Sequence, residues 1–223
     1  MVKTISKKTI WHLRNNTRYE NCTFDIDFVE HIKGCTFIDC RFPSEGVCFE
    51  FVENSRFMNC SFGEFIMEQI EKSFIKGGHI QCLRLSNLLT ENRKFDFLQT
   101  NNIKELHFDN CEIEKIPLPI LNIQNLLKLY LSENNIAKFP QIQKLSNLKE
   151  LYLDKNNIKV IPCEISQLRK LELLVLDDNR IEFLPEEISE LTNLRKLYLA
   201  NNCIEEDHKA GIAKKLPHCE VVF

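Results

Sequence analysis

The stretch LKELYLDKNNIKVIP, residues 148–162, sets the pattern of the C-terminal half of the chain. Leu151 and Leu153 alternate with polar residues, which predicts a short strand with one buried face. The segment that follows, PCEISQLRK (162–170), has apolar residues three positions apart after a proline. This spacing predicts a short helix or 3-10 turn that leads back to the next strand.

The same pattern, L-x-x-L-x-L-x-x-N-x-I, occurs four times in succession. It begins at Leu126, Leu148, Leu171 and Leu194, so the interval between repeats is nearly constant. Extending the register backwards by the same interval finds matching apolar sets that start at Ile103 and at Ile80, the latter with Leu83 and Leu85. One repeat cannot bury its apolar face alone, so about six repeats are expected to stack. The last segment, with Leu216, Val221 and Phe223, is expected to cover the final repeat.

With prolines at 117, 140, 162 and 185, this array resembles the leucine-rich repeat family in its L-P-x-x-I-x-x-L variety, which includes bacterial effectors. The resemblance implies an α/β solenoid with a parallel β-sheet on the concave face and short helical or 3-10 segments on the convex face. Some such effectors carry a ubiquitin-ligase domain after the repeats. Such a domain is not expected in this chain. The turn after each strand has an asparagine whose side chain is expected to bond buried backbone groups: Asn134, Asn156, Asn179 and Asn202.

The stretch GCTFIDCRF (34–42) belongs to a different repeat with a period of five. Its apolar residues are Phe37, Phe42, Val47, Val52, Phe57, Phe62 and Met67, and small residues two positions earlier include Cys35, Cys40 and Cys60. This pattern resembles the pentapeptide-repeat family, which implies a short right-handed β-helix with the cysteines as core filler. Glu45 and Glu50 break the pattern and are expected to face solvent. The alternative is that residues 20–79 are divergent, shortened leucine-rich repeats.

Three segments are therefore predicted: an N-terminal cap (1–19), a pentapeptide-like β-helix (20–79) and a leucine-rich repeat domain (80–223), joined near Gly77 and Gly78. Trp11 in the cap is expected to pack on the first coil as part of an N-terminal helix, and the alternative is that it is an exposed anchor. The β-helix is expected to shield the edge of the first leucine-rich repeat.

Composition excludes several classes of protein. The 223 residues are 43% hydrophobic and 27% charged with a net charge of −3, and the charges are spread along the chain. We therefore expect neither a nucleic-acid partner nor a membrane partner. The first residues do not resemble a signal peptide, and ten cysteines without one indicate free thiols in a reducing, cytoplasmic location. A monomer is expected.

Sequence motifs for metal binding, phosphate binding or catalysis are weak. Cys35 and Cys40 lack further ligands at zinc-site spacing, the glycines form no phosphate-binding loop, and no cofactor or metal is expected. His107 and Asp109 are two positions apart on an expected strand, where they could act as base and orienting group, but no nucleophile accompanies them. An ordinary polar surface is the preferred interpretation, and the chain is not expected to be an enzyme.

The exposed strand positions are the best candidate site. The expected concave face has three of the four tyrosines in one column around an apolar centre, with acidic residues along one border. Tyrosine is enriched in interface cores, and an acidic border favours a partner with basic rim residues. The predicted partner-binding residues are Tyr130, Tyr152, Val175, Tyr198, His107, Asp154, Asp177, Leu173, Lys128 and Glu150.

The sequence thus predicts a protein–protein interaction module that displays a preformed surface. A bacterial effector delivered into the cytosol of a host cell is a finer version of this hypothesis. The alternative, suggested by the pentapeptide resemblance, is an inhibitor or regulator of a DNA-handling enzyme. That role needs a strongly acidic surface, whereas residues 1–79 have ten basic and eleven acidic side chains.

Overall fold

The computed structural model of the chain describes residues 3–71, 73–76, 79–85, 98–99, 103–116 and 118–223. Two compact units are present: residues 1–107 with 117–123, and residues 108–116 with 124–223. The predicted junction at Gly77 and Gly78 lies outside the described residues, as does Pro117. The domain boundary at residue 80 stays a prediction.

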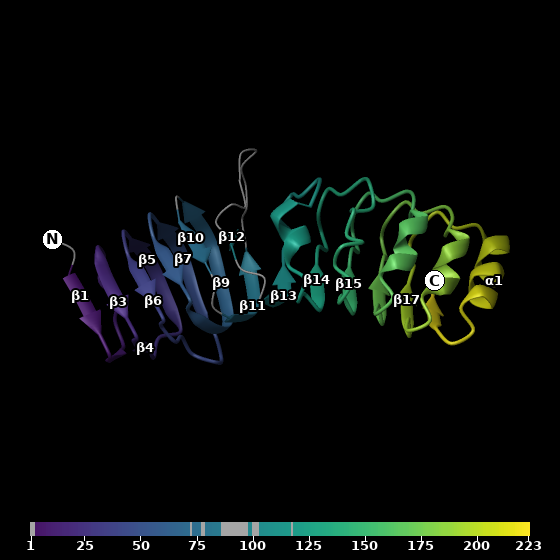
Figure 1. Cartoon of the computed structure of the whole chain (residues 1–223). Helices are drawn as coiled ribbons and strands as arrows, with labels where there is room; N and C mark the ends of the chain where they lie inside the picture. The colour runs from purple at the N-terminus through teal and green to yellow at the C-terminus, as the bar shows by residue number, and fades with distance from the viewer. Residues whose placement is uncertain (1–2, 72, 77–78, 86–97, 100–102, 117) are drawn as a thin grey trace. The chain divides into compact units, whose positions relative to one another are not determined.

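Parallel strands, each one coil further along the chain, build the first unit (Figure 1). Within the described residues, one sheet has in spatial order β1 (Lys3–Ser6), β3 (Thr17–Glu20), β6 (Thr36–Ile38), β8 (Arg56–Met58), β10 (Phe74–Lys76) and β12 (Leu98–Gln99). A second row has β5 (Phe28–Lys33), β7 (Val47–Glu53), β9 (Ser61–Glu71), β11 (His79–Leu85) and β13 (Ile103–His107). The short strands β2 (Thr9–Ile10) and β4 (Thr23–Phe24) also pair in parallel.

Left-handed residues mark the corners of these coils. Positive φ angles occur at Asn16, Gly34 and Asn54 on one corner, and at Asn21, Asp39 and Asn59 on another. Asparagine, aspartate and glycine tolerate this conformation better than other residues. The corner amides continue the coil-to-coil ladder: Asp39 N, for example, donates to Met58 O at 2.9 Å. The choice of residue type at the corners therefore helps fix where each coil turns.

Stacked aromatic rings fill the interior of the first unit. Tyr19 stacks on Phe37 at 5.2 Å between ring centroids, and Phe37 stacks on Phe57 at 4.7 Å. A second stack runs through Phe24, Phe42 and Phe62. Rings repeat at the same coil position because the strands are in register, so each ring is buried against its copy in the next coil.

The five-residue apolar pattern from Phe37 to Met67 is confirmed as the buried face. All seven of its apolar residues are buried, Cys35, Cys40 and Cys60 are at most 2% exposed, and Glu45 and Glu50 are exposed as expected. The register shows why a step of five does not reach Tyr19: Phe37 is paired with both Tyr19 and Phe57, but the coil that leads from Tyr19 to Phe37 is the shorter one. The assignment to the pentapeptide-repeat family stays a prediction.

The preferred prediction for Trp11, packing within a helix, is wrong, and the side chain is exposed as in the alternative. The described part of the cap contains β1, β2 and the start of β3 instead of a helix, and Trp11 is 60% exposed. Its Nε1 donates a hydrogen bond to Asp25 Oδ2 at 3.1 Å. The polar indole edge is thus satisfied at the surface, and the interior at this level is filled by Tyr19 and Phe24, which are buried.

The second unit contains shorter parallel strands and the predicted return limbs. Its strands are β14 (Lys128–Tyr130), β15 (Glu150–Tyr152), β16 (Leu173–Val175), β17 (Lys196–Tyr198) and β18 (Glu220–Val222), paired in that order. The return limbs include the 3-10 helices η3 (Cys163–Gln167) and η4 (Glu186–Glu190), and α1 (Glu206–Lys215) follows the last full repeat. The 3-10 helix η2 (Leu118–Asn122) is grouped with the first unit.

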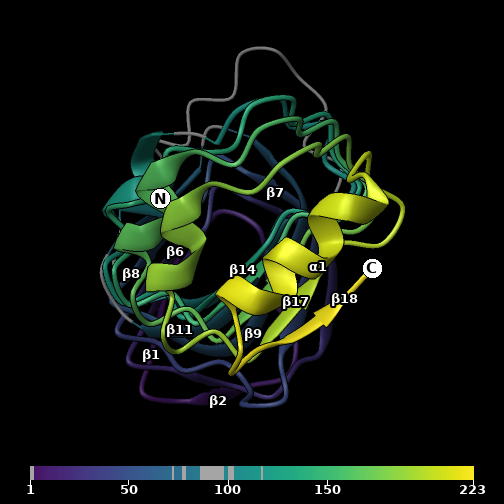
Figure 2. The same ribbon diagram turned by 90° about the vertical axis from the view of Figure 1, so that its right-hand side faces the viewer.

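Leucine and isoleucine columns form the core of the second unit, as the repeat predicts. Leu129, Leu151, Leu174 and Leu197 occupy the middle of successive strands, and all four are fully buried. The backward extension of the register is also confirmed, since Ile80 pairs with Ile103 and Leu83 with Leu106 between β11 and β13. The prediction for the closing segment is confirmed for Leu216, which is buried, and is wrong for Phe223, which is 38% exposed. Val221 is partly buried in β18, which pairs with β17 (Figure 2). No helix in the described segments is long and apolar enough to cross a membrane.

Candidate functional site

One face of the β14–β18 sheet presents the predicted site. In β14, β15 and β16 the middle residue is buried and the two outer residues are partly exposed. Successive side chains of a strand point to opposite faces, so the outer residues of every strand share one face. We call this set the strand-face stripe: Lys128, Tyr130, Glu150, Tyr152, Leu173, Val175, Lys196, Tyr198, Glu220 and Val222.

Aromatic and apolar side chains form the first column of the stripe. The register places Tyr130 beside Tyr152, then Val175, then Tyr198, then Val222. The rings of Tyr130 and Tyr152 stack with 4.3 Å between centroids and 9° between planes. Stacking fixes both rings against the sheet while leaving them half-buried, so a partner would meet a preformed aromatic surface.

Charged residues that neutralise one another form the second column. Lys128 Nζ lies 3.5 Å from Glu150 Oε1, and Lys196 Nζ lies 3.3 Å from Glu220 Oε2. Leu173 separates the two pairs in the register. The first pair is partly exposed and the second is exposed, so both contribute little to stability, but they leave the column without a strong net field. Any electrostatic preference of the face must therefore come from elsewhere.

Tyr152 connects the two columns. Its hydroxyl donates a hydrogen bond to Glu150 Oε2 at 3.0 Å. Burial, together with this bond to a carboxylate, raises the pKa of Tyr152 above its ordinary value. The hydroxyl therefore stays protonated and keeps a fixed direction, so Tyr152 is held both by stacking and by a hydrogen bond.

A row of aspartates lies just beyond the strands. Asp109 Oδ1 accepts from Ser132 N at 2.9 Å, Asp154 Oδ1 accepts from Ser132 Oγ at 2.5 Å, and Asp177 Oδ1 accepts from Ala200 N at 2.7 Å. Burial first, and then the neighbouring carboxylates Asp154 and Asp178, raise the pKa of Asp177. The predicted acidic border thus also holds successive repeats together, with one oxygen of each carboxylate engaged in the fold.

The turn asparagines support this edge from inside. Asn156 Oδ1 accepts from Ile136 N at 3.0 Å, while its Nδ2 donates to Leu131 O and Leu153 O at 2.9 and 3.0 Å. Asn134, Asn179 and Asn202 make equivalent bonds in their own repeats. The predicted role of these side chains, to bond otherwise unpaired backbone groups, is confirmed. Cys111, which replaces asparagine in an earlier repeat, is also buried.

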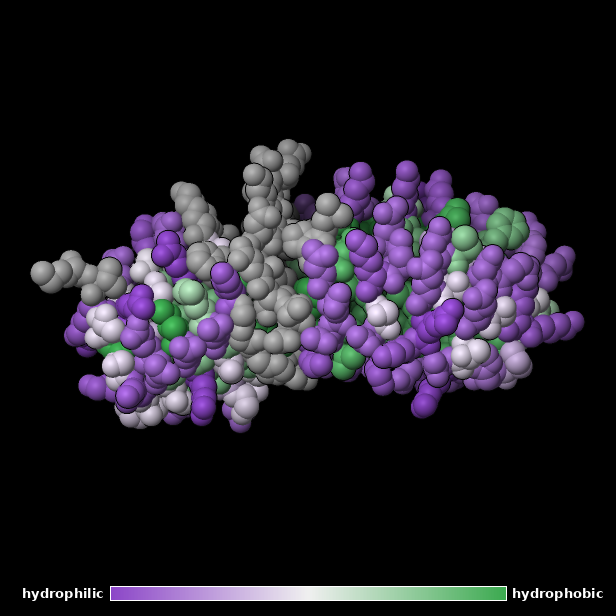
Figure 3. Space-filling view, in the orientation of Figure 1, coloured by the Kyte–Doolittle hydropathy of each residue, from purple (hydrophilic) through white to green (hydrophobic). Residues whose placement is uncertain are grey.

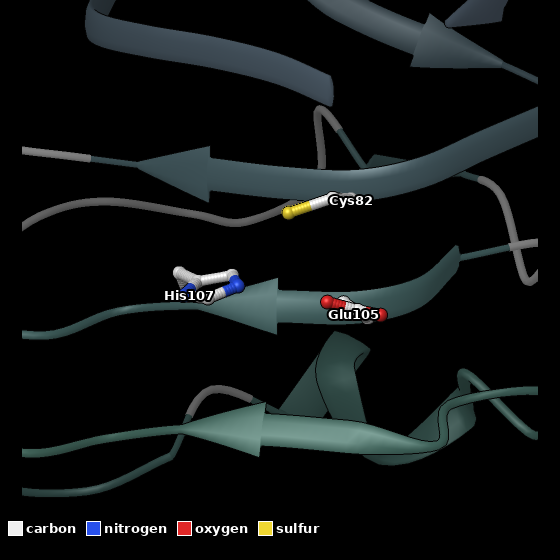
Figure 4. Close-up of side chains that lie close together, drawn as sticks. All are labelled: Cys82, Glu105 and His107. Carbon is white, nitrogen blue, oxygen red and sulfur yellow. The ribbon is translucent and has the colours of Figure 1, made fainter. Parts of the chain in front are cut away.

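His107 does not belong to the exposed face, contrary to the prediction. It is only 8% exposed, its Nδ1 lies 3.4 Å from Arg84 Nη1, and it is part of the first unit. The long side chain of Arg84 stands directly opposite on the neighbouring strand and covers the imidazole, which the repeat pattern alone does not reveal. Within the first unit, His107 instead lies near Cys82 and Glu105 (Figure 4), donors that could hold a metal ion.

The end of the stripe is not predicted by the sequence pattern. Glu220 and Val222 are expected only as part of a closing segment, yet β18 adds them to the two columns beside Lys196 and Tyr198. A period-two signal is present in EVV (220–222), but the segment lacks the leucines that mark the other strands.

Hydrophilic side chains cover much of the visible face of the second unit, with hydrophobic ones exposed between them (Figure 3).

One family model and one relative match parts of this chain. A family model for the leucine-rich repeat matches residues 146–204. Rat osteomodulin is 27% identical over 136 residues, which is 55% of this chain and 31% of that protein, so the match spans about a third of its length.

Two solved structures are similar at low identity. A leucine-rich repeat protein of Leptospira interrogans is 19% identical, with a TM-score of 0.39, over 93% of this chain and 72% of that one. The ectodomain of the Arabidopsis thaliana receptor kinase GASSHO1/SCHENGEN3, in complex with Casparian strip integrity factor 2, is 18% identical, with a TM-score of 0.46, over 84% of this chain and 29% of that one. The predicted resemblance to leucine-rich repeat proteins is confirmed by the family model over residues 146–204.

Proposed function

We propose that this chain is a non-enzymatic protein-interaction module that binds a partner protein through the strand-face stripe. The stacked, half-buried pair Tyr130 and Tyr152 is the observation that supports this most strongly. Aromatic anchors held rigidly before binding lose little conformational entropy, so a few of them can supply most of the affinity.

The surroundings of the pair indicate the chemistry of the partner. The second column is internally neutralised, while Asp154, Asp177 and the exposed Asp178 form an acidic margin beside the aromatic column. A partner with an apolar or aromatic centre and basic residues at one rim fits this arrangement. A cytoplasmic location, a monomeric state and the role of a bacterial effector delivered into a host cell remain predictions from the sequence.

The test compares three versions of the folded chain in affinity capture from a cell lysate, read out by mass spectrometry. The first is the parent, and the second carries Tyr130→Ala, Tyr152→Ala and Tyr198→Ala. The matched control carries Lys144→Ala, Gln167→Ala and Glu190→Ala, three exposed positions on the return limbs of the repeats. Circular dichroism must show that all three are folded.

A protein retained by the parent and the return-limb control, but lost by the tyrosine variant, supports the proposal and names the partner. The affinity of that partner for the chain should then fall by at least about tenfold for Tyr152→Ala alone, since truncating an interface hot spot costs about 2 kcal/mol or more. Equal capture by all three versions would contradict a role for the stripe.

A further inference from the structure

The register of three strands in the first unit brings chemically reactive side chains together. Glu64 of β9 pairs with Cys82 of β11, and Cys82 pairs with Glu105 of β13. Two positions further along, Arg84 pairs with His107. Residues two apart on a strand point to the same face, so the five side chains are expected on one face of neighbouring strands. Figure 4 shows three of them, Cys82, Glu105 and His107.

Three of these side chains converge. One ligand atom from each of Cys82, Glu105 and His107 lies within 4.8 Å of the other two. In a tetrahedral zinc site with bonds of about 2.0–2.3 Å, ligand atoms are roughly 3.3–3.8 Å apart. Side-chain movements of about 1 Å are therefore sufficient to close the set around one ion. Cys82 and His107 are each 8% exposed and Glu105 is half-buried, which leaves an approach from solvent on the Glu105 side.

The kinds of donor identify the class of ion. A thiolate, an imidazole and a carboxylate suit Zn²⁺, whereas Mg²⁺ and Ca²⁺ prefer sets made of oxygen alone. Three protein ligands also leave a fourth position for water or for a further side chain. Glu64 is the nearby candidate, because its Oε1 lies 3.9 Å from Cys82 Sγ.

One positive charge opposes a cation at this place. The guanidinium of Arg84 lies beside His107, with 3.4 Å between Nη1 and Nδ1, and forms an ion pair with Glu64. A dication bound at His107 would be repelled by the guanidinium of Arg84. The ion pair between Arg84 and Glu64 offsets part of that repulsion. Removing the charge of Arg84 should therefore strengthen metal binding, an effect with the opposite sign to that of removing a ligand.

We propose that Cys82, Glu105 and His107 form a zinc-binding site in the first unit. On binding, the S–H bond of Cys82 breaks, a Zn–S bond forms and one proton leaves to solvent, with no change in oxidation state. The site is independent of the strand-face stripe, so its failure would leave the proposed function untouched.

Cobalt(II) titration of the full chain, reduced and freed of metal, tests the proposal. A thiolate ligand gives Co²⁺ a charge-transfer absorption, and Zn²⁺ should displace the Co²⁺ while Mg²⁺ should not. Calorimetry with Zn²⁺ in two buffers of different ionisation enthalpy should count about one released proton. Cys82→Ser should abolish the absorption, and Glu105→Gln and His107→Gln should each weaken zinc binding at least about tenfold.

Two further variants distinguish this site from metal binding by surface thiols. Cys163 and Cys203 are exposed, so the double variant Cys163→Ser/Cys203→Ser should bind as the parent does. Arg84→Gln should bind zinc more tightly than the parent. This variant still tests the proposal if a variant that removes a buried ligand does not fold. The proposal is overturned if the parent shows no thiolate absorption, if the absorption survives Cys82→Ser in a folded protein, if it disappears with the exposed cysteines, or if Arg84→Gln leaves binding unchanged or weaker.

Discussion

Asn156→Ala should destabilise the second unit by at least about 3 kcal/mol, with little change at the exposed surface. Asn156 bonds three buried backbone groups, Ile136 N–H, Leu131 C=O and Leu153 C=O, which belong to two successive repeats. A buried polar group that loses its partner costs about 1–3 kcal/mol. Three groups at the low end of that range give the expected value, and it is larger than the effect of most single substitutions.

Urea denaturation followed by circular dichroism measures this change. For slopes of at most about 3 kcal/mol per molar urea, a loss of about 3 kcal/mol moves the midpoint by about 1 M or more. Asn135→Ala is the matched control, because Asn135 is exposed at the same turn of the neighbouring repeat and should cost less than about 0.5 kcal/mol. Asn156→Asp should also destabilise, since a carboxylate can accept from Ile136 N but cannot donate to the two carbonyls.

If the urea midpoints of Asn156→Ala and Asn135→Ala coincide, the side chain of Asn156 is not what stabilises the backbone groups of the turn. The role assigned to the repeated asparagine would then be wrong, although the leucine columns would still account for the core. A change of slope without a change of midpoint would also count against it, because the effect would lie in the extent of unfolding.

Two further predictions follow from burial and ionisation. Under native reducing conditions the exposed thiols of Cys163 and Cys203 should react with a thiol reagent much faster than the thiol of Cys35. Cys35 is buried, and this burial raises the pKa of its thiol. Mass spectrometry of labelled peptides measures the rates, and equal rates would contradict the assignment of Cys35 to the interior. The pKa of Tyr152 is raised, mainly by burial, above its ordinary 10.0, so the folded state keeps this proton after the unfolded state loses it. The free energy of unfolding should therefore fall as the pH rises above about 10, and Tyr152→Phe should reduce that fall. Denaturation at several pH values between about 8 and 11 measures the free energy of unfolding of both proteins. Identical dependence of this free energy on pH in the two proteins would refute the raised pKa of Tyr152.

The sequence is informative wherever one repeat position has one structural role. The leucines of the second unit lie in the same column in each repeat, so counting by the repeat length locates strands, turns and the tyrosines of the exposed face. The first unit is harder to predict, because successive coils differ in length. The coil from Tyr19 to Phe37 is shorter than the coil from Phe37 to Phe57, so a fixed period finds part of the aromatic stack and misses its first ring.

The proposed zinc site shows why such clusters escape a search for local motifs. Zinc ligands are usually sought as residues a few positions apart, whereas Cys82 and Glu105 are separated by a whole coil and are neighbours only because β11 and β13 pair in that register. Side chains alternate between the faces of a strand, so a shift of the pairing by a single position would send the partner of Cys82 to the opposite face. The length of a coil therefore decides which donors meet, as it decides that Tyr130 stacks on Tyr152 of the next repeat. In a protein built of parallel coils, functional side chains should be sought along the ladder from strand to strand, with the register of each pair as the guide.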